Sequence, residues 1–231
     1  MQVATIGLDL AKHVFQIHGF PIVMTATGDP VATGIIASLA RPGGNITGNT
    51  AIAAEVMSKN MELIREMLPK AERVAAFANS IDPFTTPYLQ HIEAAAGALR
   101  INLERVMARP TDNADSYFET MRAKNIDAVI VQPTLMRPGV GDLALKHQLP
   151  AFSMNTQFPH MGGLLAYGAN AEAQWREGAV YIDRVLKGQR PADLPVAQPT
   201  KFDLVINLKT ARALGLEVPP TLLARADDVI E

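Results

Sequence analysis

The sequence has no cysteine among its 231 residues. Disulfide bonds, thiolate catalysis and cysteine-based metal sites are therefore excluded together. It also has no long run of basic residues, and its formal net charge is -2. Because phosphate binding depends on clustered Lys and Arg, nucleic acid is not expected as a partner. No apolar run approaches the roughly 20 residues that a membrane-spanning helix needs.

The first twenty residues lack the features of a secretory signal. They have no basic start, their apolar stretch is interrupted by Asp9, Lys12 and His13, and no small-residue cleavage site follows. As written, the chain is therefore expected to stay in the cytoplasm.

Signatures of catalysis are missing as well. No G-x-S-x-G elbow is present, and the five histidines are scattered without the spacing of metal ligands. Residues 139–144 fit the pattern G-x-G-x-x-A, but residues 133–138 separate them from the preceding strand, whereas a dinucleotide fingerprint needs a tight turn. We expect no enzyme activity, no cofactor and no bound metal.

Regular alternation of short apolar runs and helical patterns marks the middle of the chain. Strands are expected at 73–78, 103–108, 128–132 and 151–154, and helices at 88–99, 114–124 and 141–147. This order predicts βαβ units and a parallel sheet covered by helices on both faces. Outside this region, strands are expected at 3–8, 14–18, 21–25, 45–48, 164–168 and 204–207, and helices at 30–39, 53–68, 172–186 and 208–214.

Two segments follow the same plan. Each has an apolar strand end, then small polar residues, and then Asp-Pro, at Asp29-Pro30 and at Asp82-Pro83. Asp suits the N-cap of a helix and Pro suits its first position. Such strand-to-helix connections at the carboxyl edge of a parallel sheet are where α/β proteins bind ligands, and a helix N-terminus attracts a carboxylate. Asp-Pro turns are also common in α/β proteins that bind nothing there, so both interpretations stay open.

Three long runs resemble a bacterial family of ABC-transporter substrate-binding proteins. They are PIVMTATGDPVATG at 21–34, LARPGGNITG at 39–48, and the stretch from Lys187 to Ala211 that contains PADLPV, QPTKF and LVINLKTA. The resemblance implies the type I periplasmic-binding-protein fold, an α/β fold of two lobes with parallel sheets flanked by helices. It also implies a second lobe at 49–161 and a first lobe at 1–48 plus 162–231.

The start of the chain departs from the family pattern. Members carry a leader and several βα units ahead of the segment that matches Pro21, and these are not seen, so the first lobe is expected to be incomplete. Residues 3–19 instead resemble the opening hairpin of a transposase with an RNase H-like domain, in which Asp9 would match a metal ligand. Since no further carboxylates of that pattern follow, nuclease activity is not expected.

The resemblance implies reversible capture of a small molecule between the lobes, with an amino acid as ligand and an aromatic one favoured by relatives. Hydroxyls and helix N-terminal N–H groups would hold a carboxylate. Asp29 would pair with an ammonium or, more simply, cap its own helix. The candidate ligand-binding residues are Thr25, Ala26, Thr27, Asp29, Asn79, Ser80, Phe84, Pro133, Thr134, Asn155, Phe158 and Tyr167.

Partners and alternatives follow from the same resemblance. A transporter permease is the expected protein partner, and the family works in the periplasm or anchored outside the membrane. An open sheet edge in the first lobe would favour a homodimer. The alternative functions are a remnant that binds nothing, or a sensor or effector domain of the same fold.

Overall fold

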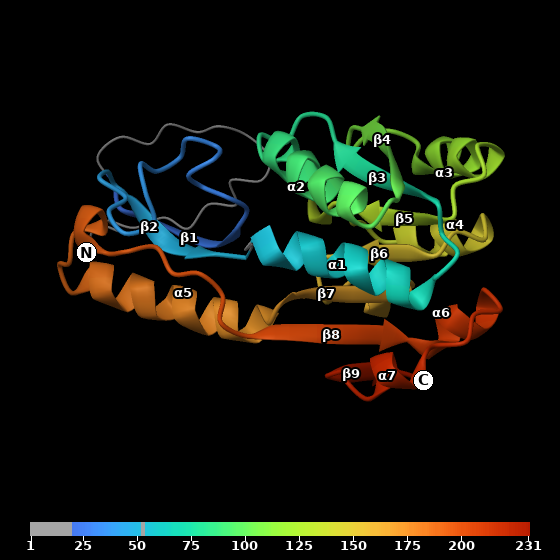
Figure 1. The fold of residues 1–231 in the computed structure, drawn as a ribbon. Coiled ribbons are helices and arrows are strands. Elements are labelled where there is room, and N and C mark those ends of the chain that lie inside the picture. The colour runs from blue at the N-terminus through green and yellow to red at the C-terminus, as the bar shows by residue number, and fades with distance from the viewer. Residues whose placement is uncertain (1–19, 52–53) are drawn as a thin grey trace. The chain divides into compact units, whose positions relative to one another are not determined.

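A computed structural model describes residues 20–51 and 54–231, which form two compact units (Figure 1). Unit 1 consists of the described residues up to 51 together with 82–87 and 169–201. Unit 2 consists of 54–81, 88–168 and 202–231. The stretch compared with a transposase hairpin, including Asp9 and the strands expected at 3–8 and 14–18, lies outside the described residues.

Unit 1 is built on two parallel strands, β1 (Ile22–Thr27) and β2 (Ile46–Thr50), with helix α5 (Ala171–Leu186) packed on them. A 3₁₀ turn, η3 (Pro191–Asp193), follows the helix. One apolar cluster joins Val23 of β1 to Tyr181 and Val185 of α5. The strands pair closely because Gly48 has φ +128, and a side chain there would meet the carbonyl oxygen of Met24 at 1.9 Å.

The helix expected at 30–39 is wrong. Residues 30–34 form a turn and 35–37 form bends. The N–H groups of Ile35 and Ile36 both donate to the carbonyl of Pro30, at 2.9 and 3.1 Å. The helical pattern stops after this one turn, where Gly34 takes a φ of +74 that a helix does not allow.

Unit 2 contains a seven-stranded sheet in the order β4-β3-β5-β6-β7-β8-β9. Its strands are β3 (Arg73–Asn79), β4 (Asn102–Ala108), β5 (Ala128–Val131), β6 (Ala151–Ser153), β7 (Leu165–Ala169), β8 (Phe202–Asn207) and β9 (Asp228–Ile230). Its helices are α1 (Ala54–Met67), α2 (Thr85–Ala98), α3 (Ala114–Ala123), α4 (Val140–Lys146), α6 (Leu208–Ala213) and α7 (Pro220–Leu223), with 3₁₀ turns η1 (Pro133–Leu135) and η2 (Pro159–Met161). The first three residues of α2 group with unit 1.

Strands β3 to β7 pair in parallel, as the alternation of strands and helices predicts. Strand β8 runs in the opposite direction in Figure 1, and the N–H of Asn207 at its end donates to the carbonyl of Leu164, just before β7 begins. One face of the sheet buries a cluster that includes Phe77, Phe118 and Phe158. The parallel strands therefore share one carboxyl edge, while the C-terminal strands extend the sheet from the other direction.

Helix ends in both units are set by asparagines. The side chain of Asn113 accepts from the N–H of Asp115 at the start of α3, and Asn170 accepts from Ala173 at the start of α5. Asn207 does the same for α6. Each side-chain oxygen satisfies a backbone donor that a helix leaves unpaired, so the sequence fixes where these three helices begin.

The two units divide the chain differently from the lobes expected from the sequence. Residues 162–168 and 202–231 group with unit 2, whereas the expected first lobe contains all of 162–231. The physical reason is that β7, β8 and β9 hydrogen-bond into the sheet of β3 to β6. Helix α7 and strand β9 in the tail were not expected from the sequence. No helix in the described ranges combines the length and the apolar character that crossing a membrane requires.

Candidate ligand-binding residues at the strand ends

The carboxyl end of β1 is strained. Ala26, which is exposed, has φ +54, and the register between β1 and β2 shifts between Met24 and Thr27. The N–H of Ala26 donates to Oδ1 of Asn49 at 2.8 Å. Non-glycine residues with positive φ cost energy and cluster at functional sites, so this bulge is a candidate position for ligand contact.

A buried polar network holds the two strand ends of unit 1. Nδ2 of Asn49 donates to the carbonyl of Gln174 in α5 at 2.8 Å, and Nε2 of Gln174 donates to the carbonyl of Thr50 at 2.7 Å. The side chains of Asn49 and Gln174 thus bridge β1, β2 and α5. The Oγ1 of Thr50 and the Oε1 of Gln174 are buried and have no hydrogen-bond partner within the described part of the chain.

The side chains of the three polar candidates in unit 1 all contact nearby parts of the same unit. Oγ1 of Thr25 faces α5 at Gly178, where a Cβ would lie 2.5 Å from it. Oγ1 of Thr27 makes only long contacts, 3.4 Å to the carbonyl of Asn49 and 3.5 Å to the sulfur of Met24. Oδ1 of Asp29 accepts from the N–H groups of Val31 and Ala32 at 3.0 and 2.9 Å. Asp29 therefore caps a single turn, because the helix that it was expected to cap does not form.

The second Asp-Pro turn has the same kind of carboxylate cap as the first, but it leads into a helix. Oδ1 of Asp82 accepts from the N–H of Phe84 at 2.9 Å, just ahead of α2. The ring of Phe84 is mostly buried and lies against Gly28, where a Cβ would be 2.6 Å from the ring. Both turns group with unit 1, and Phe84 links them.

Unit 2 brings together candidates from the carboxyl ends of β3 and β5. Asn79 is buried, its N–H donates to Oε1 of Gln132 at 2.7 Å, and its Nδ2 lies 3.3 Å from Oγ1 of Thr134. Thr134 and Pro133 form η1, directly after β5, and both are half-buried. Gln132 is fully buried and connects the two strand ends, a role that its position in the sequence does not predict.

The remaining polar candidates, Ser80 and Asn155, each make a hydrogen bond that shapes the surrounding backbone. Ser80 is exposed, and its N–H donates to the carbonyl of Ala108 at 2.8 Å. Oδ1 of Asn155 accepts from the N–H of Gln157 at 2.9 Å, which completes a turn after β6. Their side chains remain candidates, although Asn155 is partly engaged in shaping its own loop.

The two aromatic candidates of unit 2 lie in different surroundings. Phe158 is fully buried in the core and packs against Gly163, so in this structure it presents no surface to a ligand. Tyr167 is half-buried in β7, and its ring stacks on Phe202 of β8 with centroids 5.8 Å apart. Its carbonyl accepts from Nδ2 of Asn60 in α1 at 2.7 Å.

A groove of about 520 Å³ lies beside Tyr167 on this face of unit 2. Val56, Ser58, Lys59, Glu62, His91, Ala94, Tyr167 and Phe202 line it. Lys59 and Glu62 form an exposed ion pair across 2.9 Å at its rim. An ion pair in this setting adds little stability, so the stacked rings are the main fixed feature of the groove.

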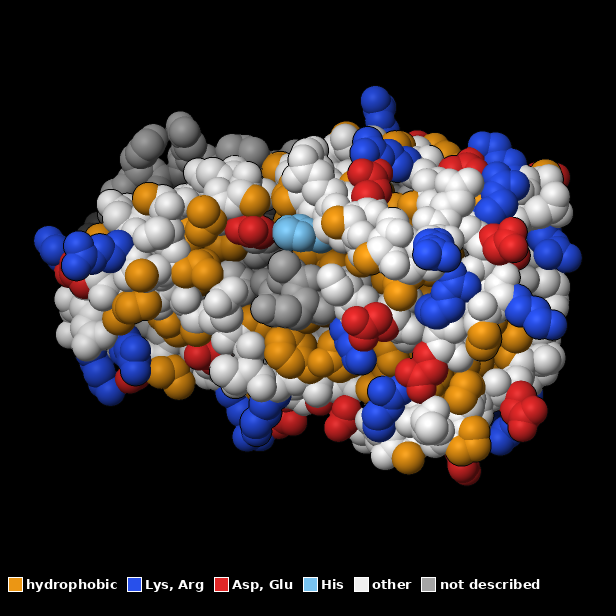
Figure 2. Space-filling view, in the orientation of Figure 1, with side chains coloured by type: hydrophobic (Ala, Val, Ile, Leu, Met, Phe, Trp, Pro, Cys, Tyr) orange, Lys and Arg blue, Asp and Glu red, His pale blue; other side chains and the backbone are white. Residues whose placement is uncertain are grey.

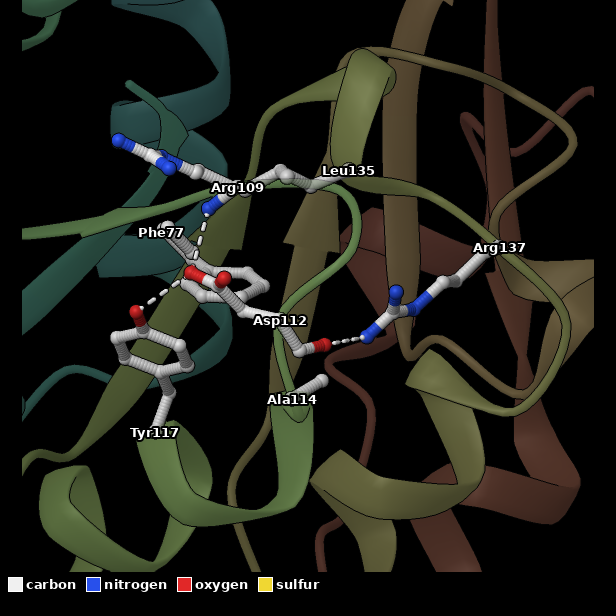
Figure 3. Close-up of a pocket in the computed structure, with 8 residues that line it drawn as sticks. Phe77, Arg109, Asp112, Ala114, Tyr117, Leu135 and Arg137 are labelled. Carbon is white, nitrogen blue, oxygen red and sulfur yellow. Dashed lines mark hydrogen bonds between the residues drawn. The ribbon is translucent and has the colours of Figure 1, made fainter. Parts of the chain in front are cut away.

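Figure 3 shows how the loop after β4 is held at the carboxyl edge of the unit 2 sheet. Oδ2 of Asp112 accepts from the N–H of Arg109 and from the hydroxyl of Tyr117, both at 2.8 Å. The guanidinium of Arg137 donates to the carbonyls of Pro110 and Asp112. The backbone N–H of Arg109, followed by the Tyr117 hydroxyl, holds the pKa of Asp112 below its ordinary value. The space enclosed is too small for an organic ligand, so this constellation stabilises the loop.

The sequence pattern does not predict the structural roles of three polar residues, Asn49, Gln132 and Gln174. Each is a polar residue on a buried face, where apolar residues set the pattern. For Gln174 the available signal is its spacing from Gly178, Tyr181 and Val185, which places it on the buried face of α5. No group of three or more His, Asp or Glu side chains in the described ranges is placed to hold a metal ion.

Comparison with known proteins places these features in a family. The model of the ABC transporter substrate binding protein family matches residues 3–230, which includes the stretch compared with a transposase hairpin. A protein of Clostridioides difficile strain R20291 called tyrosine-binding protein is 23 % identical over 201 residues. That match covers 85 % of this chain and 57 % of the relative, so the chain spans less than two thirds of the relative's length.

Solved structures of similar proteins have the same fold as this chain. A domain from Streptococcus pneumoniae in complex with L-Trp is 26 % identical, with a TM-score of 0.85 over 92 % of this chain and 72 % of that one. A conserved domain protein from Vibrio cholerae is also 26 % identical, with a TM-score of 0.84 over 91 % of this chain and 71 % of that one. The resemblance and the α/β fold expected from the sequence are confirmed, and the chain belongs to the ABC transporter substrate-binding protein family.

Proposed function

We propose that this chain is the solute-binding component of an ABC transporter and that its ligand is an aromatic amino acid. The observation that carries the proposal is the similarity to the Streptococcus domain solved with L-Trp, which extends over 92 % of this chain. The name of the Clostridioides relative points to the same ligand class. By this proposal, the chain works outside the cytoplasm and delivers its ligand to a membrane permease.

The proposed contacts are polar groups at the carboxyl ends of the parallel strands. In unit 1, Ala26 and Thr27 lie at the strained end of β1, where the Thr27 hydroxyl makes only long contacts and is the group offered to the ligand. In unit 2, Asn79 and Thr134 lie within 3.3 Å of each other at the ends of β3 and β5. Such groups suit the carboxylate and ammonium of an amino acid, since both ends need hydrogen-bond partners when they leave water.

The aromatic part of the ligand requires an apolar surface. Phe84 at the second Asp-Pro turn and the half-buried ring of Tyr167 are the proposed sources, because offset stacking of rings adds to the gain from burial. Phe158 is the weakest of the proposed contacts, because its ring is enclosed in the core.

Isothermal titration with Trp, Tyr, Phe and a panel of aliphatic amino acids tests the proposal. We expect binding of at least one aromatic amino acid. Thr134→Val, which removes only the hydroxyl, should weaken it by about 10-fold, the size of one lost hydrogen bond to a charged group. Thr120→Ala, on the exposed surface of α3, is the control and should bind normally.

Two outcomes would count against the proposal. Binding of an aliphatic amino acid alone would reject the aromatic ligand class. A folded chain that binds no member of the panel would favour the alternative of a remnant, or of a sensor domain for another ligand.

A further inference from the structure

Helix α5 has two apolar faces, and within the described part of the chain only one of them is buried. Gln174, Gly178, Tyr181 and Val185 form the buried face that packs on β1 and β2. One residue further along, Trp175, Ala179, Ile182 and Leu186 form a second row with the same spacing, here called the α5 stripe. Trp175, Ile182 and Leu186 are 66 %, 40 % and 68 % exposed.

The α5 stripe is contiguous along the helix. Positions i, i+4, i+7 and i+11 fall within a narrow sector of a helix with 3.6 residues per turn, so the four side chains form one ridge about three turns long. Hydrophobic side chains reach the surface beside Lys and Arg over the region of α5 in Figure 2. Large apolar side chains gathered on one exposed ridge, with a Trp at one end, are typical of an interaction surface.

Charged residues border the α5 stripe on one side, and their order is informative. Along the helix they run Glu172, Arg176, Asp183 and Lys187. Within the chain, Arg176 pairs with Glu172 and Lys187 pairs with Asp183, and all four side chains are more than half exposed. These pairs are therefore weak and free to exchange partners.

We infer that the α5 stripe pairs with the α5 stripe of a second copy of this chain, with the two helices antiparallel about a two-fold axis. In that arrangement Trp175 faces the partner's Leu186, and Ala179 faces the partner's Ile182. Like flanks meet along an antiparallel pair, so Glu172 lies opposite the partner's Lys187 and Arg176 opposite the partner's Asp183. Every bordering charge then meets an opposite charge.

The parallel arrangement fails the same comparison. There the two-fold axis runs along the helices, so the charged flank of one helix lies on the opposite side from the charged flank of its partner, and none of the four bordering charges meets an opposite charge. The antiparallel pair alone gains complementary charges along its border, and such complementarity favours one orientation over another. The charge order along α5 therefore selects the antiparallel two-fold dimer, and two-fold dimers are the commonest homo-oligomers. This dimer uses a helix face and differs from the sheet-edge dimer expected from the sequence.

Sedimentation equilibrium of the full chain tests the dimer. We expect a mass twice that of the 24.9 kDa chain at high concentration. Ile182→Asp should weaken self-association by about 30-fold or more, the size expected for a central interface side chain. Val180→Asp is the matched control, because Val180 is an apolar residue of the same helix with 49 % exposure. It lies about 130° around the helix axis from the centre of the α5 stripe. A monomer at all concentrations, or equal effects of both variants, would overturn the inference.

Charge exchange tests the orientation. Arg176→Asp places like charges opposite each other twice in the dimer and should weaken it several-fold. The double variant Arg176→Asp with Asp183→Arg should restore association, because both intermolecular pairs are rebuilt with reversed sign. A double variant that associates no better than Arg176→Asp alone would contradict the antiparallel pairing.

Disulfide cross-linking gives a second test of orientation, since the natural chain has no cysteine. Ala179→Cys mixed with Ile182→Cys should form a covalent heterodimer on mild oxidation. Leu186→Cys alone should not cross-link, because in an antiparallel pair it lies about 11 residues, or roughly 16 Å, from its symmetry mate. Rapid cross-linking of Leu186→Cys would show a parallel pair and would refute the proposed interface.

Discussion

Asp112 shows how a single carboxylate can fix a loop at the sheet edge of unit 2. It accepts hydrogen bonds from the backbone of Arg109 and from Tyr117, and both favour its ionised form. Its pKa is therefore lower in the folded chain than its ordinary value of 3.8. A group whose pKa falls on folding contributes stability above its unfolded pKa, and that contribution is lost as the pH falls through the folded pKa.

Asp112→Asn should consequently lower the stability of unit 2 at neutral pH. The difference from the natural chain should shrink as the pH falls below 3.8, where the natural carboxylate also becomes protonated. Urea unfolding between pH 7 and pH 3 measures this. Asp142→Asn in α4 is the control, because the Asp142 carboxylate makes no hydrogen bond to any of the described residues. A difference between Asp112→Asn and the natural chain that stays constant with pH would contradict the linkage.

At the scale of elements, unit 1 depends on a polar bridge as much as on apolar packing. Its described sheet has only two strands, and a two-stranded sheet is marginal without further support. Asn49 supplies that support by joining the N–H of Ala26 to the carbonyl of Gln174. Helix α5 packs closely at this place because Gly178 leaves room for Thr25.

Asn49→Ala should therefore loosen β1, β2 and α5 together. The buried hydrogen bond to Gln174 and the partly buried one from Ala26 would both be lost, which leaves two backbone groups without these partners at a cost of about 2–4 kcal/mol. Hydrogen exchange measured by mass spectrometry should show faster exchange in peptides from 22–27, 46–50 and 171–186. Asn102→Ala, at an exposed position of β4 in unit 2, serves as the comparison. If exchange quickens only at residue 49 itself, Asn49 does not couple the three elements.

At the scale of the molecule, the course of the C-terminal strands decides which unit they stabilise. Ile206 is fully buried in β8, and β8 extends the sheet of unit 2. The sequence places these residues in the first lobe, so the two divisions make opposite predictions. One buried substitution in each unit distinguishes the two divisions of the chain.

Ile206→Ala should destabilise unit 2 by about 2–5 kcal/mol through the cavity it leaves. Hydrogen exchange should quicken in β3 to β7 and remain unchanged in β1, β2 and α5. Val23→Ala, in the core of unit 1, should give the reverse pattern. Faster exchange confined to unit 1 after Ile206→Ala would restore the division expected from the sequence.

The order of strands and helices from 73 to 154 was predictable because each element carries its own period and ends. Alternating apolar runs predict β3 to β6, and asparagine caps fix α3 and α5 locally. The helix expected at 30–39 failed because the local pattern does not reveal that Gly34 interrupts it. The direction of β8 and the addition of β9 depend on pairing between residues far apart, which no local pattern encodes.

The sequence by itself determined the family, the α/β class and the strand ends where polar residues gather, because long specific runs and periodicity are local properties. Only the tertiary structure decided that Asn49 and Gln174 brace β1 and β2, that Phe158 belongs to the core and that α5 keeps a second apolar face in solvent. Burial depends on which segments meet in space. The sequence therefore does not distinguish an apolar residue that faces the core from one that faces water.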